Sequence, residues 1–143
     1  MKSLHLNWIR NIDKSLVMPN VIFPSTLKVG GWYSSPEEGQ EYIDGCYYDK
    51  CFGIIAVDGN LPEKDHAGVI AHEWRHHWQI CHGWKFDGMG EQNLFHLIDS
   101  VGYDTAILKF FSKSKAEMDA LKFQYKYSGV YESWEYLVHD YLT

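Results

Sequence analysis

One segment constrains the fold of this chain more than any other, the helix-like run from Val69 to Gln79. Apolar residues recur in and just after it at helical spacing, and they are Val69, Ile70, Trp74, Trp78 and Cys81. Asp65 can cap the start of this helix, and Gly83 can end it. The sequence therefore predicts an amphipathic helix whose apolar face must be buried against other elements.

The middle of this helix, His72-Glu73-Trp74-Arg75-His76, has the pattern H-E-x-x-H. Residues four apart on a helix lie on one face about one turn apart, so the two imidazoles can hold one metal ion. Glu73 lies at the edge of that face, where its carboxylate can take a proton from a metal-bound water. The alternative is a surface helix that is merely rich in histidine, since the chain has eight histidines. The helical context favours a zinc site with His72 and His76 as ligands and Glu73 as general base.

A catalytic zinc ion usually takes three protein ligands plus water, so the two histidines need a third partner. The first candidate is Glu117, which lies in the strongly helical segment 114–125. Ala120 shares its face of that helix and is small enough to let the two helices approach closely. Asp119 could orient one of the ligand histidines by a hydrogen bond.

Two further histidines are alternatives for the third ligand. His82 has the spacing of an H-E-x-x-H-x-x-G-x-x-H site, but Gln79 occupies the position of the glycine that lets such a chain turn back. His96 lies on the next predicted helix. The residues alone leave Glu117, His82 and His96 open, with Glu117 favoured.

The rest of the chain alternates between short strand-like and helix-like segments. We expect helices over residues 4–17, 91–100, 104–111 and 131–142, and an edge strand over 21–23 ahead of Pro24. Residues 42–48 and 52–57 have the composition of two strands that form a β-hairpin before the motif helix. These elements predict an α+β fold in a single domain over residues 1–143, with a small, mostly antiparallel sheet packed on the motif helix.

The predicted hairpin has a possible role in binding. Its outer strand can carry an extended substrate by strand addition, which makes Cys46, Tyr47 and Tyr48 the expected substrate-binding residues. The alternative is that the hairpin only covers the core.

Composition argues against several classes of partner. The net charge is −6 and no basic run occurs, so we expect no nucleic-acid binding. No apolar run approaches membrane-spanning length, and the N-terminus lacks the apolar core of a signal peptide. The three cysteines show no C-x-x-C spacing, which favours a reducing compartment. We therefore expect a cytoplasmic protein without membrane association.

The motif and the segment Glu117-Met118-Asp119-Ala120-Leu121-Lys122-Phe123 together resemble the gluzincin type of HExxH zinc metallopeptidase, in which the third ligand heads a helix of the form E-x-x-A-x-x-F. The resemblance extends over roughly residues 42–125 and implies a minimal zincin-like fold. It implies His72, His76 and Glu117 as zinc ligands and Glu73 as general base. Such enzymes usually use a tyrosine or histidine to hold the oxyanion, for which Tyr103, Tyr125 and His96 are the candidates here.

The sequence thus predicts a zinc metallopeptidase that hydrolyses a peptide or protein substrate. Two rivals remain. The chain's many aromatic residues could form a binding surface in a non-catalytic protein with a vestigial metal site. Alternatively, the chain could be a zinc hydrolase that acts on a non-peptide substrate.

Overall fold

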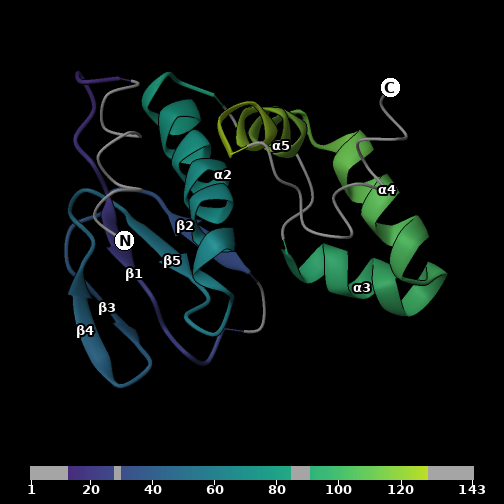
Figure 1. The fold of residues 1–143 in the computed structure, drawn as a ribbon, viewed down its shortest axis with the longest axis horizontal. Helices are drawn as coiled ribbons and strands as arrows, with labels where there is room; N and C mark the ends of the chain where they lie inside the picture. The colour runs from purple at the N-terminus through teal and green to yellow at the C-terminus, as the bar shows by residue number, and fades with distance from the viewer. Residues whose placement is uncertain (1–12, 28–29, 85–90, 129–143) are drawn as a thin grey trace.

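A computed structural model of the chain describes residues 13–27, 30–84 and 91–128, except for the side chains of 91–95, 111–113 and 127–128. The described ranges contain strands and helices in an α+β arrangement, which confirms the predicted class (Figure 1). The helix predicted over 131–142 lies outside these ranges, as does most of the one over 4–17. Residues 13–17 form a turn instead of a helix, with the Leu16 N–H donating to the Asp13 carbonyl (3.4 Å).

The main sheet has three strands in the order β1-β5-β2. These are β1 (Asn20–Ile22), β2 (Gly31–Ser34) and β5 (Ile54–Val57). β1 runs parallel to β5 and β2 runs antiparallel to it. All four residues of β5 are apolar and fully buried, because the strand lies at the centre of the sheet and both faces of the sheet are covered. The short strand predicted next to Pro24 is the edge strand β1.

The predicted hairpin of residues 42–48 with 52–57 is wrong. The chain turns back earlier, so that β3 (Gln40–Ile43) pairs with β4 (Cys46–Asp49) in a separate two-stranded sheet. Asp44 and Gly45 form the turn, with φ angles of 52° and 86°. Positive φ at both central residues is the geometry that an Asp-Gly pair favours in a tight hairpin. This local signal ends the first strand within the run that the prediction treated as continuous.

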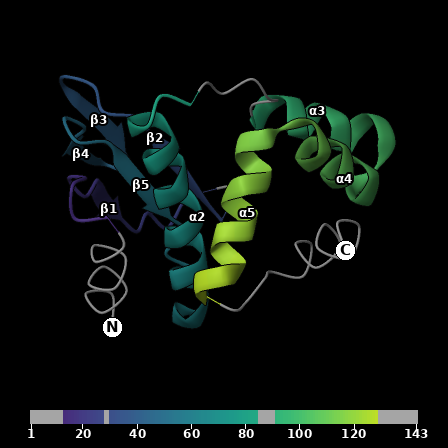
Figure 2. The same ribbon diagram turned by 90° about the horizontal axis from the view of Figure 1, so that it is seen from above.

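The β3–β4 hairpin covers the face of the main sheet that is turned away from helix α2 (Glu63–Cys81). Ile43 and Tyr48 of the hairpin pack against a buried cluster of Ile22, Ile54 and Ala56. The opposite face of the sheet contributes Ile55 and Val57 to a second cluster, which the apolar residues of α2 complete. Figures 1 and 2 show the resulting order of hairpin, sheet and α2.

Helix α2 contains the H-E-x-x-H motif and begins earlier than the apolar pattern suggested. It starts at Glu63 directly after Pro62, and the predicted cap Asp65 lies within its first turn. There its negative charge is favourable, because a helix N-terminus carries partial positive charge. The predicted stop at Gly83 is confirmed. Gly83 has a φ of +79° and its N–H donates to the Ile80 carbonyl, while the Trp84 N–H donates to the Gln79 carbonyl, which is a Schellman motif.

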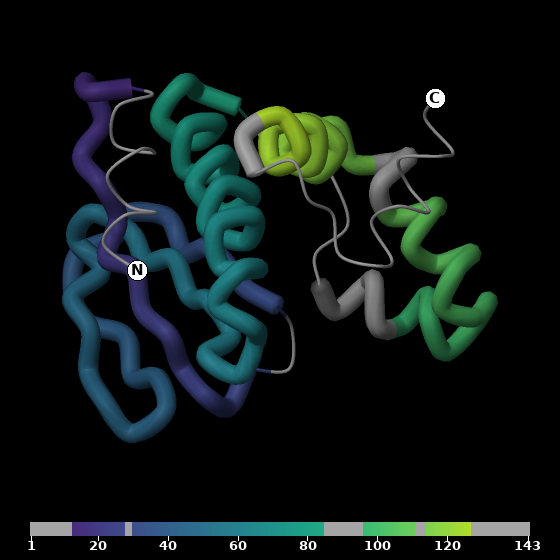
Figure 3. Tube along the Cα trace, in the orientation of Figure 1, coloured from purple at the N-terminus to yellow at the C-terminus, as the bar shows by residue number. Residues whose placement is uncertain are grey.

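Three further helices follow, α3 (Glu91–Val101), α4 (Tyr103–Lys113) and α5 (Lys115–Ser128). They match the predicted segments to within a few residues, with Gly102 separating α3 from α4. Figure 3 shows that α5 lies beside α2, while α3 and α4 lie farther from the sheet. Stacking of Trp74 on Phe123 (ring centroids 5.5 Å apart) joins α2 to α5. Among the described residues, no helix is both long and apolar enough to cross a membrane.

Candidate metal centre

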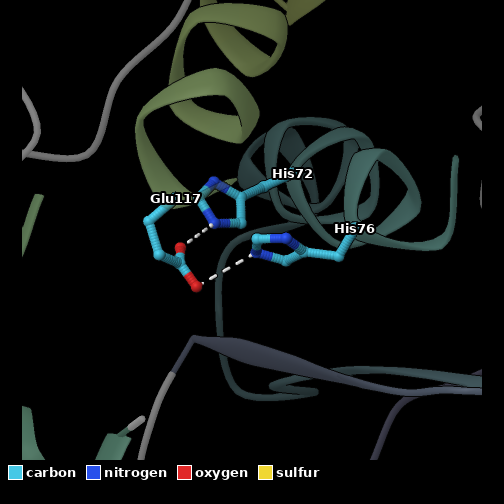
Figure 4. A group of neighbouring side chains, drawn as sticks. All are labelled: His72, His76 and Glu117. Carbon is cyan, nitrogen blue, oxygen red and sulfur yellow. Dashed lines mark hydrogen bonds and ion pairs between the residues drawn. The ribbon is translucent and has the colours of Figure 1, made fainter. Parts of the chain in front are cut away.

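The side chains of His72 and His76 project from one face of α2 towards α5 (Figure 4). Their spacing of four residues places them one turn apart, as the sequence predicted, and their ring centroids lie 5.0 Å apart. Their side chains are 12% and 8% exposed, respectively. Both rings are therefore held within the interface between the two helices, with a small part open to solvent.

Glu117 meets both rings from the first turn of α5. Its Oε2 lies 3.0 Å from Nε2 of His72, and its Oε1 lies 3.1 Å from Nε2 of His76 (Figure 4). The approach is close because Ala120, one turn further along α5, is fully buried and adds only a methyl group to the interface. Ser114 precedes the helix and its Oγ accepts from the Glu117 N–H (3.2 Å), which is the hydrogen bond of a helix N-cap residue.

The three residues place donor atoms within 4.8 Å of one another. In a tetrahedral zinc site with bonds of about 2.0–2.2 Å, ligand atoms lie roughly 3.3 Å apart. The two His-to-Glu distances, which go to different oxygens of the carboxylate, are each within a few tenths of an ångström of that value. Two imidazole nitrogens and a carboxylate oxygen also form one of the donor sets that catalytic zinc uses. The three residues could therefore hold a metal ion.

Electrostatics couple Glu117 to the two rings. Burial favours the neutral form of Glu117, but hydrogen bonds from His72 and His76 outweigh it and hold the pKa of this carboxyl well below its usual value of 4.5. Burial also opposes protonation of His76. The hydrogen bond to Glu117 and the charges of Glu117 and Glu73 outweigh that effect and raise the pKa of His76 above 6.5. The charged form of Glu117 and the protonated form of His76 therefore favour each other.

In His72 and in His76, the ring nitrogen that does not face Glu117 lies within hydrogen-bond distance of a glutamine side-chain oxygen. Nδ1 of His72 lies 3.0 Å from Oε1 of Gln124, and Nδ1 of His76 lies 2.9 Å from Oε1 of Gln79. The Nδ1–H groups can donate to these oxygens and leave Nε2 of each ring free for a metal. Asp119, the residue expected to orient one of these histidines, accepts from the side chains of Arg75 and Gln79, and Gln79 in turn meets His76. No spacing rule marks glutamines, so only the packing of α5 on α2 reveals them.

Glu73, the predicted general base, is 8% exposed and lies beside the metal site on α2. Its negative charge contributes to the raised pKa of His76. Its Cγ lies 3.7 Å from the point where a Cβ on Gly31 would be, at the start of β2. Glu73 is therefore next to His76 on one side and next to the edge strand β2 on the other.

The two alternative ligands lie outside the cluster. His82 caps the end of α2, where its ring stacks on Trp78 (centroids 4.2 Å apart) and its Nδ1 lies 2.8 Å from the Trp78 carbonyl oxygen. His96 is exposed on α3. Of the three candidates, the structure brings only Glu117 to His72 and His76.

His77 and the candidate oxyanion residues Tyr103 and Tyr125 are not members of the donor group of His72, His76 and Glu117. His77 is buried, with Nε2 donating to the Val17 carbonyl (3.0 Å) and Nδ1 accepting from the Tyr33 hydroxyl (2.7 Å). Burial lowers the pKa of His77 and so favours this neutral form. His77 thus connects α2 to β2 and to the N-terminal segment. Tyr103 and Tyr125 are exposed on α4 and α5.

The predicted substrate-binding residues Cys46, Tyr47 and Tyr48 lie on β4. The main sheet separates this strand from α2, and α5 lies on the far side of α2 (Figures 1 and 2). The strands that pack on α2 are β2 and β5. The hairpin on which that prediction was based, residues 42–48 paired with 52–57, does not form, because β4 pairs with β3.

Comparison with known proteins found no relative of this chain. No protein-family model, no curated protein and no solved structure matches the chain.

Proposed function

We propose that this protein is a zinc-dependent hydrolase that cleaves peptide bonds, with the ion held by His72, His76 and Glu117. The convergence of these three side chains from α2 and α5 is the observation that carries the proposal. A surface helix rich in histidine gives no reason for a carboxylate 41 residues after His76 to meet both rings.

The number of donors favours a catalytic site over a structural one. Structural zinc sites are closed by four protein ligands, whereas catalytic sites use three and keep one position for water or substrate. Within residues 13–27, 30–84 and 91–128, the donor group has three members. The Glu117 side chain is 25% exposed, so part of it is open to solvent.

Glu73 is the proposed general base. A bound zinc ion would polarise the scissile carbonyl and lower the pKa of its water towards about 7. Glu73 then accepts a proton from the attacking water and passes it to the leaving amine nitrogen. Burial of Glu73 beside His76 supports this assignment, because the low local dielectric strengthens its interaction with a nearby proton.

The edge strand β2 is the proposed platform for an extended peptide, in place of Cys46, Tyr47 and Tyr48. β2 lies at one edge of the main sheet, pairs with β5 on its inner side and packs on α2. An open strand edge can hold a peptide through main-chain hydrogen bonds. Gly31 starts this strand next to Glu73, so a peptide along β2 would pass close to the proposed base. We propose a zincin-like fold as part of this function.

A non-catalytic role in protein binding is the second candidate, and one surface favours it. Tyr42 and Tyr47 face each other across β3 and β4, with ring centroids 5.0 Å apart and exposures of 62% and 69%. Exposed aromatic side chains are enriched at binding surfaces. In this case the metal would stabilise the α2–α5 pair and Glu73 would have no chemical task.

Substitution of Glu73 separates the two candidates. For Glu73→Gln we expect zinc content to equal that of the unchanged protein, while cleavage of a fluorogenic peptide library falls about 10²- to 10⁴-fold, the usual contribution of a general base. Elemental analysis of the full chain gives the metal content, and chelation followed by zinc addition tests whether cleavage requires the metal. Glu38→Gln makes the same chemical change at an exposed loop residue and should alter neither quantity.

Glu117→Ala is the companion variant, because it removes a proposed ligand and should lose zinc and activity together. Equal loss of zinc and turnover in Glu73→Gln would contradict the assignment of Glu73 as base. Zinc binding by the unchanged protein without any metal-dependent cleavage would favour the non-catalytic candidate.

A further inference from the structure

Gln79 is a fully buried polar side chain on α2, one turn beyond His76. A buried amide is costly unless its donors and its acceptor are satisfied. Here its Nε2 donates to the Ala116 carbonyl (2.9 Å) and to Oδ2 of Asp119 (2.8 Å), and its Oε1 lies 2.9 Å from Nδ1 of His76. Both amide hydrogens and the oxygen therefore have partners, all of them near the metal centre.

These partners fix the direction of the amide. A carbonyl and a carboxylate only accept hydrogen bonds, so the NH₂ group of Gln79 must face Ala116 and Asp119. Its oxygen must then face His76, and an oxygen can only accept. His76 therefore donates from Nδ1, and Nε2 is left as the nitrogen that faces Glu117 at 3.1 Å.

The ion pair of Arg75 with Asp119 supports the hydrogen bonds of Gln79 at the end away from His76. Asp119 accepts from Nε of Arg75 (2.7 Å) and from Nη2 of Arg75 (3.3 Å), which is the fork geometry typical of Arg–carboxylate pairs. Arg75 also lies over the Trp78 ring, 3.8 Å from its centroid. Asp119 therefore cannot turn away from Gln79 without losing a guanidinium partner. Arg75, Asp119, Gln79 and His76 form a continuous series of hydrogen bonds across the α2–α5 interface.

The hydrogen bond from Gln79 to the Ala116 carbonyl holds the backbone next to Glu117, the third proposed ligand. The Ala116 carbonyl belongs to the same peptide bond as the backbone nitrogen of Glu117. By donating to it, Gln79 fixes the first turn of α5 against α2 at the residue that supplies the carboxylate. One side chain therefore orients the His76 ring and locates the backbone of Glu117.

We infer that Gln79 is the main positioning residue of the metal centre, through its hydrogen bonds to His76, the Ala116 carbonyl and Asp119. The inference rests on the metal site of the proposed function. Gln124 is the natural comparison, because it contacts the ring of His72 but lies seven residues beyond Glu117, two turns along α5. Its loss leaves the first turn of α5 attached to α2.

The test compares Gln79→Met with Gln124→Met, since methionine keeps the length of glutamine and removes the amide. Zinc affinity is measured on the full chain by competition with a chromophoric chelator. We expect the Kd for zinc to rise about 10- to 100-fold in Gln79→Met, the usual effect of removing a residue that orients a ligand. Gln124→Met should show a smaller rise. Equal affinity of Gln79→Met and the unchanged protein, or a larger effect of Gln124→Met, would overturn the inference.

A spectroscopic measurement keeps the inference testable even if Gln79→Met does not fold. In the zinc-loaded, unchanged protein, the Nδ1 proton of His76 should give a protected, downfield ¹H–¹⁵N resonance, because it is buried and donates to Gln79. The ring of His96, exposed on α3, is the internal reference. Exchange of the His76 proton as fast as that of His96 would contradict the inference. If the role of Gln79 were confined to stability, Gln79→Met would lower thermal stability without changing the zinc affinity of the folded protein, and this result would also overturn the inference.

These outcomes are distinct from failure of the proposed function. If the unchanged protein binds no zinc, the metal site itself is wrong and so is the inference. If it binds zinc and Gln79→Met binds it equally well, only the role of Gln79 is wrong.

Discussion

The two sides of helix α2 meet their neighbours in different ways. Towards the sheet, α2 presents Val69 and Ile70, which pack with Ile55 and Val57 in one buried apolar cluster. Towards α5, it presents histidine, arginine and glutamine side chains, each bonded to a named polar partner. Trp74 joins the two regions, since it belongs to the apolar cluster and stacks on Phe123 of α5.

The difference shows how one helix can serve both stability and chemistry. Apolar burial is non-directional, so the sheet side depends mainly on the size and shape of its residues. Buried polar groups need specific partners at hydrogen-bond distance, so the α5 side depends on atom-by-atom placement. We therefore expect changes on the sheet side to alter unfolding free energy and changes on the α5 side to alter metal binding.

The largest expected effect on stability is that of Ile70→Ala. Ile70 is fully buried, and removal of its larger side chain leaves a cavity against β5. We expect the unfolding free energy to fall by about 2–5 kcal/mol in urea denaturation. The zinc affinity of the folded fraction should stay unchanged, and Ile70→Val should lose about 0.5–1.5 kcal/mol. A clear loss of zinc affinity in Ile70→Ala at constant folded fraction would show that the two sides are not separable.

A smaller loss is expected from Gly31→Ala, which tests the contact between β2 and α2. A Cβ at Gly31 would overlap Cγ1 of Val69 and lie 2.7 Å from the Ala56 carbonyl oxygen. Overpacking of this kind costs about 1–3 kcal/mol, measurable as a lower midpoint in urea. Cleavage should also fall beyond the loss of folded protein, because the shift occurs next to Glu73.

The double variant Gly31→Ala with Val69→Ala is the control for this overlap. The change at Val69 removes one of the two clashing partners, so the combined loss of stability should be smaller than the sum of the two single losses. Simple additivity would mean that the Cβ is accommodated by movement elsewhere.

The smallest expected effect is the pH dependence of the unfolding free energy, which tests the charge interactions on the α5 side of α2. In metal-free protein, the raised pKa of His76 contributes stability that is fully present below about pH 6.5 and is lost as pH rises through the folded pKa. The lowered pKa of Glu117 contributes stability that is present above its usual value of 4.5 and is lost as pH falls towards the folded pKa. Between pH 4.5 and 6.5 both contributions are therefore present, so the stabilisation by the His76–Glu117 pair should be largest there, while the lowered pKa of His77 removes stability as pH falls below 6.5.

Added zinc should reverse the upper part of this trend. Zinc competes with protons for the ligand atoms, so its stabilisation should increase as pH rises from 6 to 8. Thermal unfolding with chelator and with excess zinc at each pH measures both trends. A zinc-induced shift that is independent of pH over this range would contradict protonation of the metal-free site.

Much of the candidate site could be predicted because its pattern is local. The four-residue spacing of His72 and His76 on a helix fixes their common face. The choice of Glu117 followed from a small residue, Ala120, one turn further along a helical segment. The helices α2 to α5 also matched, because apolar periodicity and the breaks at Gly83 and Gly102 are properties of neighbouring residues.

Strand pairing and the polar network depended on contacts distant in sequence. β5 is the same four-residue apolar run whether it pairs with β4 or with β1 and β2, and its sequence does not specify which. Here the Asp44-Gly45 turn was overlooked, although it is a local signal. The roles of Gln79 and Gln124 had no such signal, because an amide becomes informative only when its partners are known.

The sequence by itself determined the motif helix, its apolar side and the common face of His72 and His76, because these follow from helical periodicity. It left Glu117, His82 and His96 open as the third ligand, and the packing of α5 on α2 decided for Glu117. Tertiary structure alone decided which strand lies beside Glu73, and which side chains orient His72 and His76. The physical reason is that hydrogen bonds between distant segments require distances and angles that arise only when α5 packs on α2.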